Sequence, residues 1–147
     1  MFKKILLPTD GSPAARASAE VVASQIQAGD DVHVTVVLVI QPLNSDESDF
    51  DDEVVERHNA KMREKAQAAL KLTSGVFEAR GISCSTKVLE GDPVSTAIAE
   101  EATSGGYDVI VMGSRGLGMS KTDLHYLGSV TEHVIRRVGM PVLVVPA

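Results

Sequence analysis

The stretch ILLPTDGSP, residues 5–13, places a buried-type strand directly before a glycine turn and the start of a helix. Residues 5–7 are aliphatic, Gly11 permits a tight turn, and Ser12-Pro13 is typical of a helix N-cap followed by the first helical residue. A strand that leads through a glycine turn into a helix is typical of an open α/β sheet. At such a turn, free backbone N–H groups and the positive end of a helix dipole can meet a phosphate.

A second glycine segment occupies a matching place later in the chain. The buried-type run VIVM, residues 109–112, precedes GSRG at 113–116, and GSV follows at 128–130. Both segments follow a strand and lead towards a helix. We therefore predict a nucleotide site shared between two strand ends.

Strand-like and helix-like segments alternate along the whole chain. Strands are expected at 3–7, 32–40, 82–89, 107–112 and 141–145. Helices are expected from Ser12 to Gly29, from about Glu53 to Ala79, from Asp92 to about Thr103, and from Ser129 to Gly139. The last two starts rest on Asp92-Pro93, read as a cap followed by proline, and on the capping-box form of residues 129–132.

This alternation predicts an α/β fold with a single open five-stranded parallel sheet and helices on both faces. The expected arrangement is Rossmann-like with strand order 3-2-1-4-5, in one domain over residues 1–147. The first and fourth strands are then neighbours, so both glycine segments lie on one crevice at the point where the strand order reverses. The length of the chain suits one domain, and its composition suits a parallel sheet buried on both faces, because aliphatic residues dominate and aromatics make up only 3% of the chain.

The net charge of -6 is concentrated in one segment. Seven carboxylates and no Lys or Arg lie between residues 46 and 56, so the rest of the chain is near neutral. This balance argues against nucleic acid as a partner. We expect an acidic, flexible loop over about 41–53, which is a solvated connection, a lid, a repulsive guard or a partner epitope.

The cysteine count and the hydropathy pattern predict a cytoplasmic protein. Cys84 is the only cysteine, so no intramolecular disulfide can form, and we expect a buried, inert thiol. The apolar run that follows Lys3-Lys4 is too short for a signal peptide, and no run approaches the ~18 residues of a membrane span. The four histidines have no common metal-ligand spacing, so we predict no protein-held metal site.

The chain resembles the universal stress protein family over nearly its whole length. The resemblance begins at residues 5–12 and includes EGDP at 90–93. Its strongest part extends from DVIVMGSRG at 108–116 through GSVTE at 128–132 to PVLVVP at 141–146. The ATP-binding branch of the family carries a Gly-x2-Gly-x9-Gly-Ser/Thr motif. Here Gly113, Gly116, Gly128 and Ser129 supply its members.

The resemblance implies a set of nucleotide-binding residues. Asp10 would contact adenine or help to place a metal, and the Val39 backbone would meet the adenine edge; a turn role for Asp10 and a core role for Val39 remain open. The glycines would let the backbone approach ribose and phosphates. The full set of implied residues is Pro8, Thr9, Asp10, Val39, Met112, Gly113, Arg115, Gly116, Gly128, Ser129, Val130 and Thr131.

The spacing of the motif departs from the family form. Eleven residues, 117–127, separate Gly116 from Gly128, where the family has nine. The extra length either bulges outward and leaves the phosphate cradle intact, or displaces the loop and weakens binding.

The resemblance implies a homodimeric, ATP-binding stress-response protein that acts as a nucleotide-responsive regulator, with Mg²⁺ carried by the nucleotide. The dimer would form through the edge strand at 141–145, as in family dimers. No pair of residues stands out as nucleophile and base, and no Walker lysine follows the glycines, so no catalytic residue is assigned. Two alternatives stay open: a slow Mg²⁺-dependent ATPase, and a dimeric scaffold for protein partners that binds no nucleotide.

Overall fold

The computed structural model describes residues 2–27, 29–46, 49–114 and 128–146. Five parallel strands form one sheet in the order β3-β2-β1-β4-β5, which confirms the predicted class and strand order. The strands are β1 (Lys4–Pro8), β2 (His33–Ile40), β3 (Ser83–Glu90), β4 (Val109–Gly113) and β5 (Val142–Val145).

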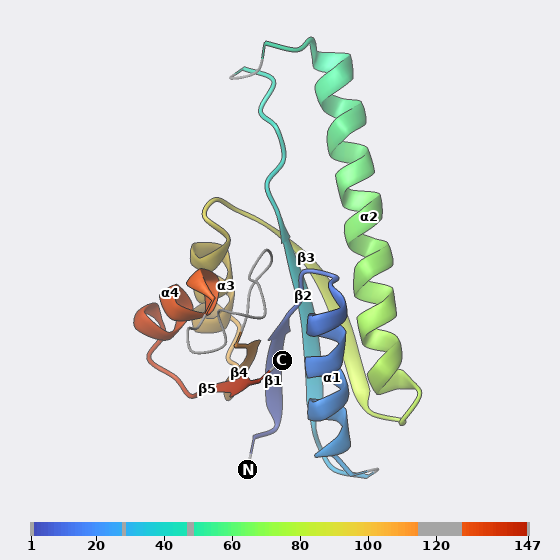
Figure 1. Ribbon diagram of the computed structural model, residues 1–147, viewed down its shortest axis with the longest axis vertical. Helices are drawn as coiled ribbons and strands as arrows, with labels where there is room; N and C mark the ends of the chain where they lie inside the picture. Colours follow the sequence, from blue (N-terminus) through green and yellow to red (C-terminus); the bar gives the residue numbers. More distant parts are fainter. Residues whose placement is uncertain (1, 28, 47–48, 115–127, 147) are drawn as a thin grey trace.

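Helices cover both faces of the sheet (Figure 1). They are α1 (Pro13–Ser24), α2 (Asp52–Glu78), α3 (Val94–Ser104) and α4 (Ser129–Arg137). The alternation of side chains along β1 explains the two layers, since Ile5 and Leu7 pack towards α1 and α2 while Leu6 packs towards α3 and α4. The sheet is therefore buried on both sides, as its aliphatic composition predicted.

The turn after β1 has the form that the sequence predicted. Ser12 caps α1 by accepting a 3.1 Å hydrogen bond from the Ala15 N–H, and Pro13 is the first helical residue. Gly11 has φ +79°, and a Cβ at this position would lie 2.9 Å from the Cβ of Ala69. Both the backbone conformation and the close approach of α2 therefore require glycine here.

Two of the predicted helix caps are wrong. The N-cap of α3 is Pro93 and not Asp92, because the Pro93 backbone is still extended (φ -75°, ψ 161°). The N-cap of α4 is Gly128, so Ser129 is already helical and forms no capping box. In both helices, no side chain caps the first turn. The helix expected to reach Gly29 also ends early, at Ser24, in a tighter turn where Gln25 donates to the Val22 carbonyl.

α2 begins inside the acidic segment that was expected to be a loop. The Val54 N–H donates to the Asp51 carboxylate over 3.0 Å, so Asp51 is the N-cap and the helix starts at Asp52. The Asn59 side chain also exchanges two 2.9 Å hydrogen bonds with the backbone of Leu43. The connection therefore runs beside α2 and is pinned to it at Leu43.

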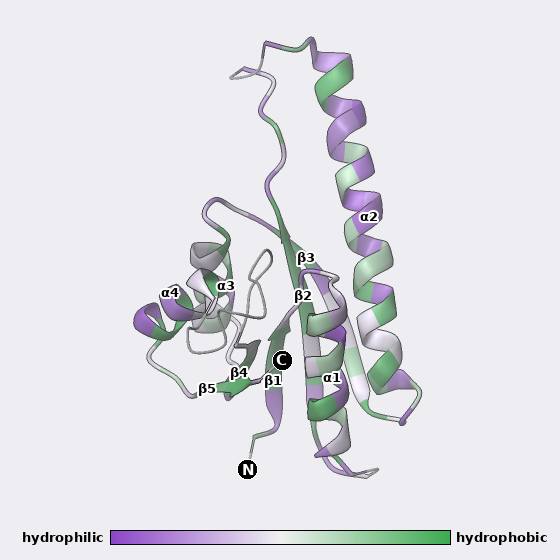
Figure 2. Cartoon of the chain, in the orientation of Figure 1, coloured by the Kyte–Doolittle hydropathy of each residue, from purple (hydrophilic) through white to green (hydrophobic). Residues whose placement is uncertain are grey.

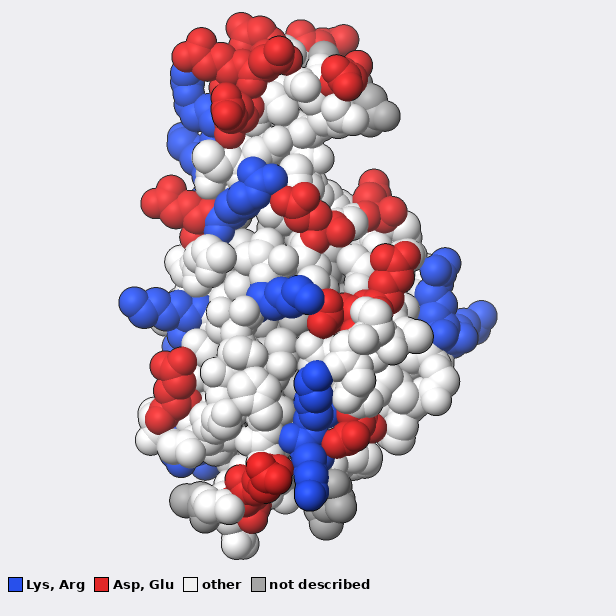
Figure 3. All heavy atoms as spheres, turned by 180° about the vertical axis from the view of Figure 1, so that it is seen from behind, with Lys and Arg blue, Asp and Glu red and all other residues white. Residues whose placement is uncertain are grey.

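The first half of α2 and the connection before it project beyond the body of the domain (Figure 1). Hydrophilic residues dominate this half of the helix (Figure 2). Acidic side chains gather at its far end (Figure 3), where Asp51, Asp52, Glu53 and Glu56 lie. The acidic segment of the sequence therefore lies at the tip of a projecting arm.

A polar cluster links α3 to the sheet through Glu101. Its carboxylate accepts hydrogen bonds from Lys87 Nζ at 2.8 Å and from the Tyr107 hydroxyl at 2.9 Å, and Lys4 Nζ lies 4.8 Å from the centre of the Tyr107 ring. Burial by itself raises the pKa of Glu101. The hydrogen bonds from Lys87 and Tyr107 outweigh it and hold this pKa below its ordinary value of 4.5.

Replacing Glu101 by glutamine is expected to lower the free energy of unfolding at pH 7 by about 1 kcal/mol or less, because Lys87 is half exposed. The folded-state pKa of Glu101 is depressed, so its contribution is present above the unfolded value and is lost as the pH falls through the folded value. The difference between Glu101→Gln and the parent should therefore shrink in acid. Urea unfolding at several pH values checks this, and a pH-independent difference would contradict it.

The lone cysteine fits the expectation of an inert thiol. Cys84 is half-buried, and burial, with a smaller contribution from the Glu78 carboxylate, raises its pKa to about 11. The thiol therefore stays protonated near neutral pH. Across the ranges that the structure describes, no helix combines the length and the apolar character needed to cross a membrane.

Candidate functional site

The carboxyl ends of β1, β2 and β4 meet at one edge of the sheet. Pro8 pairs with Val37 of β2, and Leu6 pairs with Ile110 of β4. The sheet continues with β2 and β3 on one side of β1 and with β4 and β5 on the other, so the strand order reverses at β1. The segment after β1 and the end of β4 therefore share one crevice, as predicted from the strand order.

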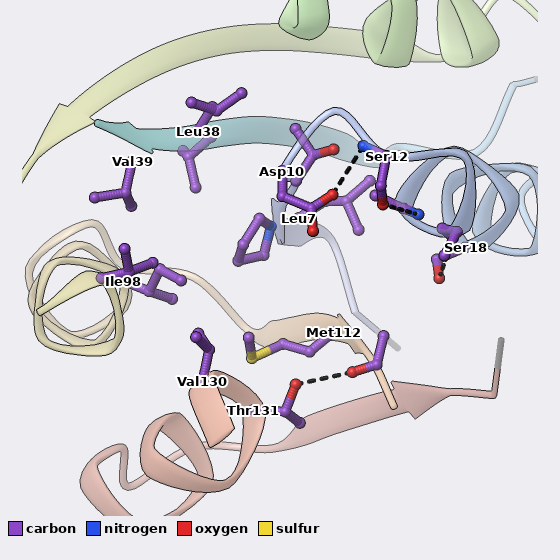
Figure 4. A pocket seen from close by; sticks show the side chains of 17 residues that line it. Leu7, Asp10, Ser12, Ser18, Leu38, Val39, Ile98, Met112, Val130 and Thr131 are labelled. Carbon is purple, nitrogen blue, oxygen red and sulfur yellow. Dashed lines mark hydrogen bonds between the residues drawn. The ribbon is translucent and has the colours of Figure 1, made fainter. Parts of the chain in front are cut away.

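A cleft of ≈ 290 Å³ opens at this edge. It lies between the turn after β1, the ends of β2 and β4, and the first turns of α1, α3 and α4 (Figure 4). Val39, Ile98, Met112 and Val130 form apolar walls that face one another across it. Apolar walls with a few polar groups at one side are typical of small-molecule sites.

The turn after β1 supplies polar groups to one side of the cleft. The Asp10 carboxylate accepts a 2.8 Å hydrogen bond from the Ser12 N–H, and the Thr9 hydroxyl accepts one of 3.2 Å from the Gly11 N–H. The Thr9 N–H donates to the Val37 carbonyl over 2.8 Å. Asp10 thus stabilises its own turn and also lines the cleft, so the turn role and a binding role are compatible.

The first turn of α4 closes the opposite side of the cleft. The Thr131 hydroxyl, which is buried, donates to the Gly113 carbonyl over 2.8 Å (Figure 4). The Gly128 N–H donates to the Ser114 carbonyl over 2.8 Å, and the Ser114 N–H donates to Val145 over 2.9 Å. These bonds fix the helix start against the end of β4. In a helix, the N–H groups of the first turn have no acceptor within the helix and can bind an anion.

The structure brings most of the sequence-predicted site residues together. Those that line the cleft are Pro8, Thr9, Asp10, Val39, Met112, Gly113, Val130 and Thr131. Gly128 and Ser129 lie at the start of the same helix but do not line the cleft. Arg115 and Gly116 lie outside the described residues, as does the longer segment 117–127.

Comparison with known proteins identifies the family. The model of the universal stress protein family matches residues 1–146. The chain belongs to the universal stress protein family. A universal stress protein of Synechocystis sp. (strain PCC 6803) is 34% identical over 146 residues, which cover 99% of this chain and 87% of the relative. The universal stress protein MJ0577 of Methanocaldococcus jannaschii is 32% identical over 163 residues, covering 99% and 95%.

Solved structures of the family share this fold. The structure of MJ0577 has a TM-score of 0.83 at 31% identity and covers 100% of this chain and 97% of its own. A universal stress protein solved in complex with cAMP has a TM-score of 0.70 at 25% identity, with coverage of 98% and 97%. The five-stranded α/β sheet of this universal stress protein is therefore the family fold.

Sequence reasoning missed several residues that line the cleft, most of them on helices. They are Val94 and Ile98 of α3, Ala14, Ala15 and Ser18 of α1, Ser12 before that helix, and Leu7, Val37 and Leu38 of the strands. The α1 residues could have been predicted from the sequence, because small side chains at 14, 15 and 18 directly after a glycine turn leave space for a ligand beside the strand end. Nothing in the sequence distinguishes Val94 and Ile98 as cleft residues, because their spacing is that of any amphipathic helix.

The cleft of this universal stress protein carries little charge. Among the lining residues that the structure describes, Asp10 is the charged one, and none is Lys or Arg. Nor does any group of three His, Cys, Asp or Glu within the described ranges have the geometry of a metal site. Among the described residues, an anionic ligand would therefore be bound by backbone N–H groups, such as those of the first turn of α4, and not by a Lys or Arg side chain.

Replacing Thr131 by valine is expected to lower the free energy of unfolding by about 1–3 kcal/mol. Valine keeps the shape but leaves the Gly113 carbonyl without its donor in a buried place. Each kcal/mol corresponds to a fall of about 2–4 °C in Tm for a chain of this size. Differential scanning calorimetry of Thr131→Val measures this, and Thr131→Ser, which keeps the hydroxyl, should recover most of the loss. Equal losses in both variants would contradict the role of the hydroxyl.

Proposed function

We propose that this universal stress protein binds an adenine nucleotide in the cleft and acts as a nucleotide-responsive regulator. The observation that carries the proposal is the cleft itself. Apolar walls stand at the point where the strand order reverses, and the first turn of α4 faces them. An apolar slot suits a purine ring, and a helix N-terminus suits phosphate.

The proposed pose places adenine between the apolar walls, with its edge against the Val39 backbone. Gly113 lies along the ribose and phosphates, and the family motif assigns the same role to Gly116. The N–H groups of Ser129, Val130 and Thr131 bind phosphate oxygens, and Arg115 adds positive charge. The Thr131 hydroxyl is already bonded to Gly113, so we assign this residue a backbone role only.

Mg²⁺ enters with the nucleotide in this proposal. Asp10 is an exposed carboxylate at the rim, and oxygen ligands of this kind suit Mg²⁺. The ion would neutralise phosphate charge that no Lys or Arg among the described lining residues balances. The expected setting is the cytoplasm, where adenine nucleotides are available and the single thiol stays reduced.

The relative solved with cAMP supports an adenine-type ligand. ATP, AMP and cAMP share the base and the ribose but differ in phosphate charge and shape. We propose ATP as the ligand because the chain has all four residues of the family's ATP motif, Gly113, Gly116, Gly128 and Ser129, with eleven residues instead of nine between Gly116 and Gly128.

Isothermal titration of ATP with Mg²⁺ into protein stripped of nucleotide tests the proposal. Binding in the micromolar range or tighter is expected, with AMP, cAMP and GTP as comparison ligands and with Gly116→Val expected to lose binding. Absence of heat and of a thermal shift up to millimolar ATP would overturn it. Release of phosphate from bound ATP, lost in Asp10→Ala and Gly116→Val, would favour the slow ATPase.

A scaffold for protein partners is the second candidate function. The observation that favours it is the acidic arm, which projects from the domain on the first half of α2 (Figure 1). None of the described residues of this arm lines the cleft. If no adenine nucleotide binds, this candidate takes first place.

We further propose a homodimer through β5. The two edges of the sheet differ in character. β5 is apolar along its length (Figure 2), and Leu143 is 51% exposed, whereas β3 carries Ser83, Ser85 and Lys87. An exposed apolar edge strand favours pairing with a strand of another chain, whereas polar and lysine side chains on an edge strand oppose such pairing. A two-fold axis beside β5 would cover this edge.

A further inference from the structure

A set of hydrogen-bonded polar side chains crosses the sheet at the amino ends of its strands. His33 is the first residue of β2 and pairs with Ser83, the first residue of β3. Thr35 and Ser85 pair two residues further along, so all four side chains lie on one face of the sheet. We call this set the polar relay; it consists of Ser83, His33, Ser85, Thr35, Tyr107 and Glu101. The cleft lies at the carboxyl ends of the strands, so the relay is separate from it.

The ring of His33 lies between two serine hydroxyls. Its Nδ1 is 2.6 Å from the Ser83 Oγ, and its Nε2 is 2.9 Å from the Ser85 Oγ. A serine hydroxyl bonded to one imidazole nitrogen, with the other nitrogen held by a third group, is the arrangement that activates a serine nucleophile. A neutral ring has one N–H and one lone pair, so one serine donates to His33 and the other accepts from it.

The Glu101 carboxylate determines the direction of the hydrogen bonds in the relay. An ionised carboxylate can only accept, and the Tyr107 hydroxyl donates to it over 2.9 Å. Burial raises the pKa of Tyr107, as does its bond to Glu101, whereas a hydrogen bond from Thr35 lowers it, which is the effect of a donor on the phenolate. The Thr35 Oγ1, 3.4 Å from the Ser85 Oγ, is then left to accept from Ser85.

These directions fix the tautomer of His33. Because Ser85 donates to Thr35, its oxygen accepts from the Nε2–H of His33. The lone pair of the ring is therefore on Nδ1, and the Ser83 hydroxyl donates to it. Ser83 is exposed, so a reagent can reach a hydroxyl whose proton already points at a base.

We propose that Ser83 is a serine nucleophile, that His33 is its general base, and that it takes the acyl group of small esters. The Ser83 oxygen bonds to the carbonyl carbon while its proton passes to Nδ1 of His33; the C–O bond of the ester then breaks, and the leaving oxygen takes that proton. Water attacks the acyl-serine with the same base and releases the acid. Because the site is an open sheet face, esters with a good leaving group are the expected substrates. The inference does not rest on nucleotide binding.

A fluorophosphonate tests the activation of Ser83. Its phosphorus bonds to the serine oxygen, fluoride leaves, and the proton passes to His33. Digestion and mass spectrometry should show labelling of Ser83 at least about tenfold faster than labelling of Ser104. Ser104 is a matched reference in the same molecule, because it is exposed and its hydroxyl donates to the Glu100 carbonyl over 2.8 Å. Labelling of Ser83 no faster than that of Ser104 would overturn the proposal.

Two variants separate an activated nucleophile from a hydrogen bond that only stabilises the sheet. His33→Gln keeps a polar side chain but removes the base, so labelling of Ser83 should fall at least about tenfold. Tyr107→Phe interrupts the relay between Thr35 and Glu101 and should slow labelling severalfold. A purely structural network would change the Tm of these variants and leave the labelling rate as in the parent. A parent rate in either folded variant would refute the proposed mechanism.

Hydrolysis of p-nitrophenyl acetate tests the acyl transfer. Protein quenched in acid should carry an acetyl group on Ser83, and Ser83→Ala should release p-nitrophenolate at no more than about a tenth of the parent rate. Ser104→Ala is the control and should keep the parent rate. Release at the parent rate from Ser83→Ala, or acetyl groups found only at other residues, would contradict the acyl transfer.

Discussion

Replacing Val39 by tryptophan is expected to lower the affinity for ATP by at least about 100-fold, or about 2.8 kcal/mol. Val39 stands at the carboxyl end of β2, and its side chain faces the cleft (Figure 4). An indole at this position fills the slot between the apolar walls that we assign to adenine. β-Strands accept tryptophan, and Val39 is only half-buried, so the fold should persist. Isothermal titration of ATP with Mg²⁺ measures the effect.

Val39→Ala is the matched control for this prediction. It enlarges the slot and leaves the backbone that meets the adenine edge unchanged, so affinity should fall by less than about tenfold. The Tm of both variants without nucleotide should stay within a few degrees of the parent. ATP affinity that survives Val39→Trp would place the base elsewhere and would remove the main support for the proposed pose.

The fold was predictable because several kinds of local signal agree with one topology. The aliphatic strands and the cap at Ser12 define βα units, and right-handed crossovers limit the possible strand orders. β1 and β4 are neighbours as expected, so the segments that follow them share one edge. This part of the candidate site follows directly from topology.

The helix starts at Asp92 and Ser129 were mispredicted for two different reasons. The extended backbone of Pro93 determines where α3 begins, and contacts distant in sequence determine where α4 begins. Gly128 is tied to Ser114, and the Thr131 hydroxyl is used to bind Gly113, so α4 begins where the end of β4 places it. A capping-box pattern describes only four consecutive residues. It carries no information about a strand end fifteen or more residues away.

The apolar walls of the cleft show the same limit. Ile98 faces the cleft because α3 packs on the sheet beside α4, and its sequence neighbours do not distinguish it from any other core residue.

Replacing Phe77 by alanine is expected to lower the free energy of unfolding by about 3–5 kcal/mol. Phe77 is fully buried, at 0% exposure, in the layer between α2 and the sheet, and it is the largest side chain in the fully buried set. In a chain poor in aromatics, the aliphatic neighbours cannot fill the space that the ring leaves. Chemical denaturation measures the loss, which corresponds to a fall in Tm of roughly 6–20 °C.

Val21→Ala is the control, since Val21 is 48% exposed on α1 and should change stability by no more than about 0.5 kcal/mol.

Phe77 packs on the face of the sheet covered by α1 and α2, whereas Ile98, Met112 and Val130 reach the cleft from the other side. ATP affinity of Phe77→Ala, measured well below its Tm, should therefore stay within about threefold of the parent. A fold that loses little stability on this change would mean that the α2 layer contributes little to the core. A lost affinity in a folded variant would mean that the two layers are coupled through the sheet.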